Sequence, residues 1–236
     1  MATQSFYLFE TLCGARETGL RYLDRHLARL AASAQTLAFD CDLERIRKEA
    51  LRHGAELPGD GPYRVRIRLE RLGAFEVNHA PLLPLAAAPI TLLSGADWGF
   101  ASQCSSNPLL RHKNSLRDEY DKGWKLAESQ GAFDMLFLNE RGELTEGGRS
   151  NLFLRLKDRW WTPPLSSGVL PGIMREVLLG DRSFDAGERI LYFSDLLDAE
   201  DILLCNSLRG VLQAKLLRRK SLSGEADGDD LLKGTG

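Results

Sequence analysis

The chain has 236 residues, of which 43% are hydrophobic and 27% are charged, and its formal net charge is −2. This length allows a substantial core, and the balanced charge gives no general basic field for nucleic acid, so a small anionic molecule is the better expectation for a partner. No apolar run reaches the roughly 18 residues that a membrane-spanning helix requires, which argues against a membrane protein.

The cysteines and histidines give no metal signature. The histidines show no ligand spacing, and the cysteines are widely separated with no C-x-x-C pair. This pattern argues against a zinc site and against a disulfide framework. The N-terminus lacks the charged and apolar regions of a signal peptide. Together these observations predict a reducing, cytoplasmic location.

The first hundred residues predict a small α+β unit. Between Tyr63 and Glu70, apolar residues alternate with arginine or glutamate, which is typical of a strand with one buried and one charged face. Asp24 is the expected N-cap of a helix over residues 25–38, and Arg29 lies outside the apolar stripe of that helix. The other expected elements are a strand over 5–13, a helix over 42–53, and strands over 74–78 and 90–93.

The remaining residues predict a second unit. Residues 99–114 have the composition of a linker or an active-site loop. Residues 169–172 lead through a Pro-Gly pair into a helix that ends near Leu179. A glycine-rich and acidic tail over 221–236 is predicted to be disordered. The other expected elements are a helix over 117–130, a turn over 140–143, and strands over 133–139, 151–156, 159–162 and 202–205.

Two residues on separate, turn-anchored segments could carry chemistry. Lys113 follows a proline-containing loop, and Glu146 begins a glycine turn that runs into a strand. A lysine can form a Schiff base with pyridoxal 5′-phosphate (PLP), and an acid can pair with its pyridinium nitrogen. Gly147 and Gly148 would then let the backbone pass close to the cofactor ring, where a β-carbon would collide. Each residue taken alone could equally lie on a solvated surface.

Three further features could hold a phosphate. Arg29 is placed to meet either solvent or an anion. The helix that begins after Gly172 has free N–H groups at its start, which form a ready phosphate site. The turn after the last expected strand offers the hydroxyl of Ser207, as a phosphate contact or as part of a polar turn.

These strings together resemble a known family. The chain is similar to the fold type IV PLP-dependent enzymes, the class IV aminotransferase family, and most similar to its 4-amino-4-deoxychorismate lyase members. The matching strings occur in family order across roughly nine-tenths of the chain, which chance matches to short motifs rarely do. They are Phe9-Glu10-Thr11, Asp24 through Leu30, His112-Lys113, Asn139 through Glu143, Thr145 through Phe153, Leu170 through Arg175, and Asn206 through Gly210.

The resemblance implies a role for each candidate residue. Lys113 would carry the cofactor and move protons, and Glu146 would pair with the pyridine nitrogen. The phosphate would be held by Arg29, by the Ser207 hydroxyl, and by the backbone N–H groups of two residues at the helix start, Ile173 and Met174. No role is implied for a metal.

The resemblance also implies the fold. The expected architecture is α+β with two domains, a small N-terminal α+β domain over 1–103 and a larger C-terminal domain over 104–220 that contains a distorted β-barrel. PLP would lie between the domains, and the family usually forms homodimers.

The implied reaction is the conversion of 4-amino-4-deoxychorismate to 4-aminobenzoate and pyruvate in folate biosynthesis, with an aminodeoxychorismate synthase as a further expected partner. Arg111 and Arg209 are the candidates for binding the carboxylates of this small anionic amine. The segment after the lysine, residues 114–117, departs from the Thr-Thr-Arg-Arg run of the lyase members. The alternatives are therefore a branched-chain or D-amino-acid aminotransferase, and a non-catalytic relative with the same fold.

Overall fold

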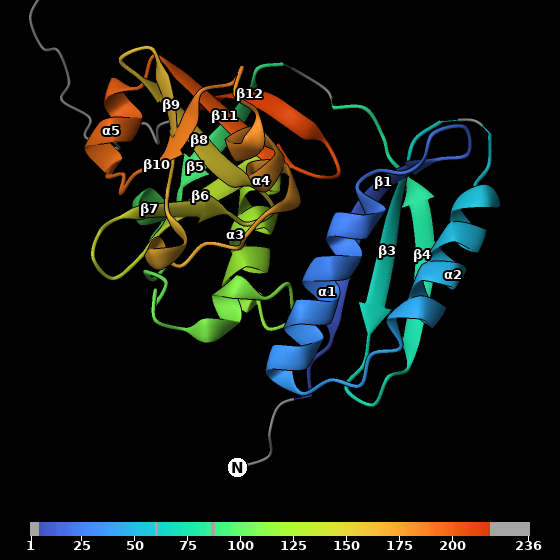
Figure 1. Ribbon diagram of the computed structural model, residues 1–236. Coiled ribbons are helices and arrows are strands. Elements are labelled where there is room, and N and C mark those ends of the chain that lie inside the picture. The colour runs from blue at the N-terminus through green and yellow to red at the C-terminus, as the bar shows by residue number, and fades with distance from the viewer. Residues whose placement is uncertain (1–4, 60, 86–87, 218–236) are drawn as a thin grey trace, which may run out of the picture.

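The computed structural model describes residues 5–59, 61–85 and 88–217, and the tail predicted to be disordered lies outside this part. The described residues form two sheets with helices beside each (Figure 1). The first sheet is antiparallel with the order β2-β1-β3-β4. Its elements are β1 (Leu8–Ala15), β2 (Gly19–Leu20), α1 (Leu23–Leu37), α2 (Leu43–Ala55), β3 (Tyr63–Leu69) and β4 (Phe75–Pro81).

Alternation along β3 determines how the first sheet packs. Val65, Ile67 and Leu69 are fully buried, and the latter two pack with apolar residues of α1 and α2 in one core cluster. The arginines between them lie on the opposite face, which the two helices do not cover. The sequence predicted this division, and its consequence is a sheet with one open, cationic face.

The starts and ends of the two N-terminal helices differ in part from expectation. α1 begins at Leu23 after Tyr22, which has a left-handed backbone conformation and makes no side-chain cap. The prediction that Asp24 is the N-cap is therefore wrong: Asp24 lies in the first turn and pairs with Arg47 of α2. α2 is capped by Asp42, whose side chain accepts a hydrogen bond from a backbone N–H of the first turn.

The second sheet has eight strands in the order β10-β9-β8-β11-β12-β5-β6-β7. An additional pairing of β7 with β8 closes six of the strands into a barrel, as the fold prediction required. The strands are β5 (Ile90–Ser94), β6 (Asp134–Leu138), β7 (Leu144–Gly147), β8 (Asn151–Leu156), β9 (Arg159–Thr162), β10 (Ala186–Glu188), β11 (Asp201–Asn206) and β12 (Gly210–Leu216). The helices of this region are η1 (Gly95–Trp98), η2 (Pro108–Arg111), α3 (Asp118–Ser129), η3 (Leu165–Ser167), α4 (Ile173–Gly180) and α5 (Phe193–Asp198).

One strand belongs to a different unit than the sequence suggested. β5 pairs with β12 and β6 in the second sheet, so its assignment to the N-terminal unit is wrong. The chain passes from the first sheet to the second between Pro81 and Ile90, which is earlier than the expected boundary at residue 103. Within the described part of the chain, none of the helices combines the length and apolar character that crossing a membrane demands.

Candidate functional site

A cavity of about 1090 Å³ is lined by residues of both sheets. Such a volume suits a cofactor together with a small substrate. Thr11 and Arg29 come from the first unit, and the barrel unit provides residues from the loop before α3 and from β7, α4 and the β11–β12 turn. The cavity therefore brings together most of the predicted site residues, namely Arg29, Lys113, Glu146, Ile173, Ser207 and Arg209.

The backbone around Lys113 is fixed against the edge of β1. The N–H of Phe9 donates to the Lys113 carbonyl at 3.0 Å, and the N–H of Ser115 donates to the Tyr7 carbonyl at 3.0 Å. The side chain of Lys113 lies over the Phe9 ring, with Nζ 4.8 Å from the ring centroid. Burial, followed by the nearby cations Arg117 and Arg29, lowers the pKa of Lys113 to about 7. A large share of this amine is therefore uncharged near neutral pH.

Glu146 lies on β7 and is buried in a polar cage. Its Oε2 accepts hydrogen bonds from Asn151 Nδ2 at 3.0 Å and from the Leu170 N–H at 3.1 Å, and its Oε1 accepts one from the Tyr120 hydroxyl at 3.2 Å. Burial raises the pKa of Glu146 to about 7, although these hydrogen bonds and the Lys113 charge act in the opposite direction. The carboxyl group is thus held in one orientation and can exchange a proton near neutral pH.

Packing against protein atoms requires glycine at the two positions after Glu146. A β-carbon on Gly147 would lie 2.5 Å from Asp134 Oδ2, and one on Gly148 would lie 2.9 Å from the Tyr120 carbonyl oxygen. The collision is therefore with buried protein atoms, which alone require glycine at both positions. Gly147 and Gly148 also line the cavity, and their close approach to a cofactor ring stays a prediction. The glycines let the chain turn around the Asp134 carboxylate, which accepts hydrogen bonds from the Arg149 N–H and the Ser150 hydroxyl.

Arg29 connects the two units. Its Nε and Nη2 donate to the two oxygens of Glu10 at 2.8 and 2.7 Å, and its Nη1 donates to the Pro171 carbonyl at 2.8 Å. A guanidinium has five N–H donors, so two remain for an anion in the cavity. The carbonyl it contacts lies immediately before the start of α4, and the predicted phosphate contacts of the arginine and the helix start are therefore close together.

Glu10 holds the side chain of Arg29, a role that the sequence reasoning did not assign. It is 1% exposed, and His26 Nδ1 lies 2.6 Å from its Oε2. Burial alone would raise the pKa of Glu10, but Arg29 and His26 outweigh it and lower the pKa to about 2. Glu10 lies between Leu8 and Leu12 on the buried face of β1, the face that these two leucines share. An acid at such a position needs a charged partner, and this was the available signal.

The residues of the other predicted phosphate contacts lie at the start of α4 and in the β11–β12 turn. Gly172 is the N-cap, and a β-carbon there would lie 1.9 Å from Asn151 Oδ1, so only glycine fits. Ile173 lines the cavity, whereas the side chain of Met174 packs in an apolar cluster and only its backbone N–H is left for the predicted role. The hydroxyl of Ser207 donates to the Thr11 carbonyl at 3.1 Å. This bond ties the turn to β1.

The two candidate substrate residues differ in their placement. Arg111 is exposed at the end of η2 and is not among the residues that line the cavity, so the structure does not support its predicted role. Arg209 lines the cavity, but its Nη1 donates to the Leu83 carbonyl at 2.5 Å. Arg209 therefore has fewer donors for a substrate than a free arginine.

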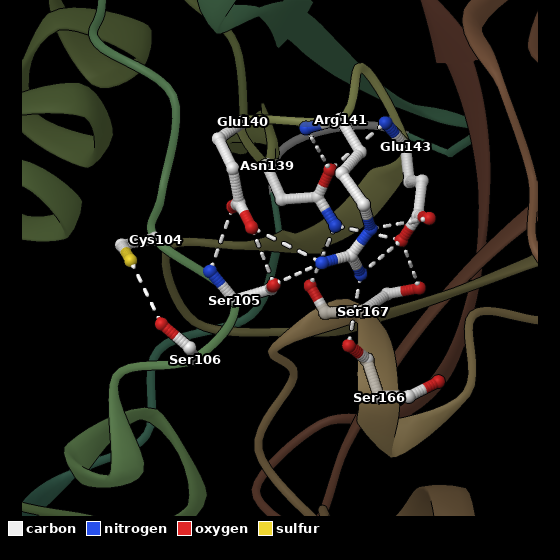
Figure 2. A network of polar contacts seen from close by, with 9 residues as sticks. All are labelled: Cys104, Ser105, Ser106, Asn139, Glu140, Arg141, Glu143, Ser166 and Ser167. Carbon is white, nitrogen blue, oxygen red and sulfur yellow. Dashed lines mark hydrogen bonds and ion pairs between the residues drawn. The ribbon is translucent and has the colours of Figure 1, made fainter.

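A polar network outside the cavity supports the segment that leads to Leu170. Figure 2 shows Arg141, in the turn between β6 and β7, directed toward Glu143 and toward the backbone of η3. Arg141 Nη2 donates to the Ser166 carbonyl at 3.0 Å, and the Ser167 hydroxyl donates to Glu143 at 2.8 Å. These contacts hold η3 in place, and the chain continues from it to the N–H group that binds Glu146.

The comparisons with known proteins agree with this geometry. Residues 7–217 match the model of the amino-transferase class IV family. The chain belongs to this family. A Schizosaccharomyces pombe protein, provisionally named an aminodeoxychorismate lyase, is 31% identical over 213 residues, which are 89% of each chain.

Solved structures of class IV aminotransferases are also similar. A provisionally named amino-acid aminotransferase from Mesorhizobium loti has a TM-score of 0.78 and 36% identity, with 90% of this chain and all of that chain covered. A hypothetical aminotransferase from Mycobacterium tuberculosis, solved with the amino form of the cofactor (PMP) and α-ketoglutarate bound, has a TM-score of 0.76 and 21% identity, with 91% and 82% covered. The relatives of this class IV enzyme thus bear both lyase and aminotransferase names.

The residues of the cavity fit PLP, the cofactor of class IV aminotransferases. Lys113 offers an amine with a pKa of about 7, and Arg29 offers two unused N–H donors. Glu146 presents a buried carboxyl group in the same cavity. An uncharged amine, a phosphate anchor and an acid for the pyridine nitrogen are the three contacts that the cofactor requires. The protein is therefore a PLP-dependent enzyme, and its predicted cofactor is confirmed.

The two shifted pKa values predict how the stability of the PLP-free enzyme varies with pH. Glu146 has a raised pKa, so its contribution to stability falls as the pH rises from about 4.5 to 7. Lys113 has a lowered pKa, so its contribution rises between about pH 7 and 10.5. The sum of the two contributions is lowest near pH 7. Replacing both residues, by Lys113→Met and Glu146→Gln, should stabilise the PLP-free protein most at neutral pH, by about 2 kcal/mol.

Urea unfolding of the wild type and the double variant at pH 5.5, 7 and 8.5 measures this difference directly. A difference in the free energy of unfolding that is the same at all three pH values contradicts the prediction.

Proposed function

We propose that this enzyme is a lyase that converts 4-amino-4-deoxychorismate to 4-aminobenzoate and pyruvate, a reaction of folate biosynthesis. The observation that carries the choice of reaction is the S. pombe relative, which matches over 89% of both chains and bears a lyase name. The cavity supports the proposal because an amine of low pKa, a buried acid and several cationic groups all line it.

The residues of the chain account for the proton movements that this reaction needs. PLP, when bound, supplies an electron sink for the carbon that bears the substrate amine. Lys113 is placed to accept the proton from that ring carbon, and the bond from the ring to the enolpyruvyl oxygen then breaks as the ring becomes aromatic. The proton passes to the methylene carbon of the leaving group, which completes pyruvate. Arg29 and Glu146 orient the cofactor, so the reaction depends mainly on a base and on positioning.

A second reaction is favoured by a different observation. The M. loti structure is 36% identical over its whole length and bears an aminotransferase name. An aminotransferase acting on branched-chain or D-amino acids uses the same lysine and acid, because both are required for any proton transfer at the substrate carbon. The alternative of a non-catalytic relative is not retained, since the family is established and both residues line the cavity.

The predicted partners remain proposals. We propose a homodimer, a small anionic amine as substrate, and an aminodeoxychorismate synthase that delivers it in the cytoplasm. Sedimentation of the PLP-loaded protein alone tests the homodimer, and sedimentation of a mixture with the synthase tests that interaction.

One assay distinguishes the two reactions. The PLP-loaded enzyme is incubated with 4-amino-4-deoxychorismate, and 4-aminobenzoate and pyruvate are measured in the same sample. We expect equal amounts of the two products. An enzyme that produces neither, but bleaches its visible absorbance with an amino acid and recovers it with a 2-oxo acid, is an aminotransferase.

A further inference from the structure

Two arginines on β3 form a cationic wall of the cavity. Arg64 and Arg66 line it, together with Phe9 and Thr11 of the neighbouring strand β1. In the antiparallel pairing of β1 with β3, Thr11 lies opposite Arg66. All four side chains lie on the face of the sheet that α1 and α2 do not cover, because alternate residues of a strand point to opposite faces.

Neither arginine has an acidic partner among the described residues. Arg64 is exposed and Arg66 is partly buried, and neither forms an ion pair with a carboxylate of the described residues. Arg68, two residues farther along the same face, is different. It pairs with Glu70 at 2.5 Å and with Glu76 at 3.7 Å, and it does not line the cavity. Two guanidinium groups therefore lie beside the cavity without an internal counter-ion.

Arg66 is held close to the reactive lysine. Its guanidinium carbon lies 4.2 Å from the centroid of the Phe9 ring, and Lys113 Nζ lies 4.8 Å from the same centroid. The distance between the guanidinium carbon of Arg66 and Nζ of Lys113 therefore cannot exceed the sum of these two distances. Stacking on an aromatic ring limits the orientations of the guanidinium group, which lowers the entropic cost of binding an anion.

We propose that Arg66, with Arg64 beside it, binds a carboxylate of the substrate while the substrate amine is directed toward Lys113. This assignment rests on the proposed function in one respect, that the substrate of the lyase carries carboxylates. It replaces Arg111, which is exposed outside the cavity. A guanidinium group binds a carboxylate through two parallel hydrogen bonds, and no carboxylate of the described residues pairs with Arg66 and would compete.

Kinetics of matched variants test the assignment. Arg66→Met keeps an apolar stem over the Phe9 ring and removes the charge. We expect KM for the anionic substrate to rise about tenfold or more, with kcat changed less than KM, and we expect Arg66→Lys to restore part of the loss. Arg68→Met is the matched control on the same strand and face, and it should leave KM unchanged. Equal effects of Arg66→Met and Arg68→Met would overturn the proposal.

A binding measurement separates this proposal from the proposed reaction. Benzoate and its uncharged analogue benzamide are titrated by calorimetry into the PLP-loaded wild type and the same variants. The wild type and Arg68→Met should bind benzoate about tenfold more tightly than benzamide, and Arg66→Met should lose this preference. If the wild type has no preference, or Arg66→Met keeps it, the carboxylate site is refuted. If the preference depends on Arg66 but no 4-aminobenzoate forms in the assay, the lyase reaction fails and the carboxylate site stands.

Discussion

Replacing Lys113 with Ala is expected to lower kcat by roughly 10⁴-fold or more, because in the proposed mechanism the same amine binds the cofactor covalently and moves the substrate proton. The geometry makes this residue hard to replace. Its backbone is fixed by hydrogen bonds to β1, and its amine has a pKa of about 7 in a cavity that also contains Arg29 and Glu146.

Borohydride reduction of the PLP-loaded enzyme gives a readout independent of turnover. The reduced cofactor should be found by mass spectrometry on the peptide that contains Lys113, and Lys113→Ala should carry none. Lys122→Ala is the control, because Lys122 is exposed on α3 and pairs with Glu119 at 2.8 Å. Label retained by Lys113→Ala on another lysine would show that the cofactor is bound elsewhere.

The sequence located the two central residues because their surroundings are short and specific. Lys113 and Glu146 each lie in a short sequence motif next to a turn, and both line the cavity. The sequence did not give the role of Glu10, because its partners His26 and Arg29 lie on α1, a separate element from β1. It also failed to identify Arg64 and Arg66, because alternation on β3 shows which face is charged but not what that face meets.

The sequence predicted the elements that carry a long hydrophobic pattern. It did not predict strand pairings between segments that lie far apart in the chain. The alternating arginines of β3 and the apolar stripe of α1 gave correct elements. β5 was assigned to the wrong unit because its partners, β12 and β6, lie far along the chain. β7 has only four residues with mixed polarity, so no period is visible, although its pairing with β8 closes the barrel.

The two units contribute different residues to the proposed mechanism. The first sheet supplies Arg29, Arg64 and Arg66, which are cations for anionic groups of cofactor and substrate. The barrel unit supplies the lysine and the acid that act on the pyridine ring and the reacting carbon. Arg29 joins the two by binding Glu10 in one unit and the Pro171 carbonyl in the other. If these proposed roles hold, the chemistry takes place at residues of the barrel unit, and substrate selection depends on the face of the first sheet that α1 and α2 do not cover.

Replacing Glu146 with Gln is expected to lower kcat by roughly 10²- to 10³-fold while the cofactor stays bound through Lys113 and the phosphate contacts. Glutamine is nearly the same size and can keep the hydrogen bonds from Asn151 and Leu170, but it cannot pair with a protonated pyridine nitrogen. The ring nitrogen should therefore lose its proton in Glu146→Gln, and the visible absorbance of the bound cofactor should change with pH differently from the wild type.

A second buried glutamate on the same hairpin provides the control for this effect. Glu143 is 3% exposed and accepts hydrogen bonds from Arg141, Asn139 and Ser167 in the network of Figure 2, but it does not line the cavity. Glu143→Gln should lower the free energy of unfolding, because Arg141 loses its anionic partner, and it should leave the protonation of the pyridine nitrogen as in the wild type. If Glu146→Gln shows the wild-type absorbance profile and turnover, the carboxylate does not set the charge of the cofactor ring, and its raised pKa reflects burial alone.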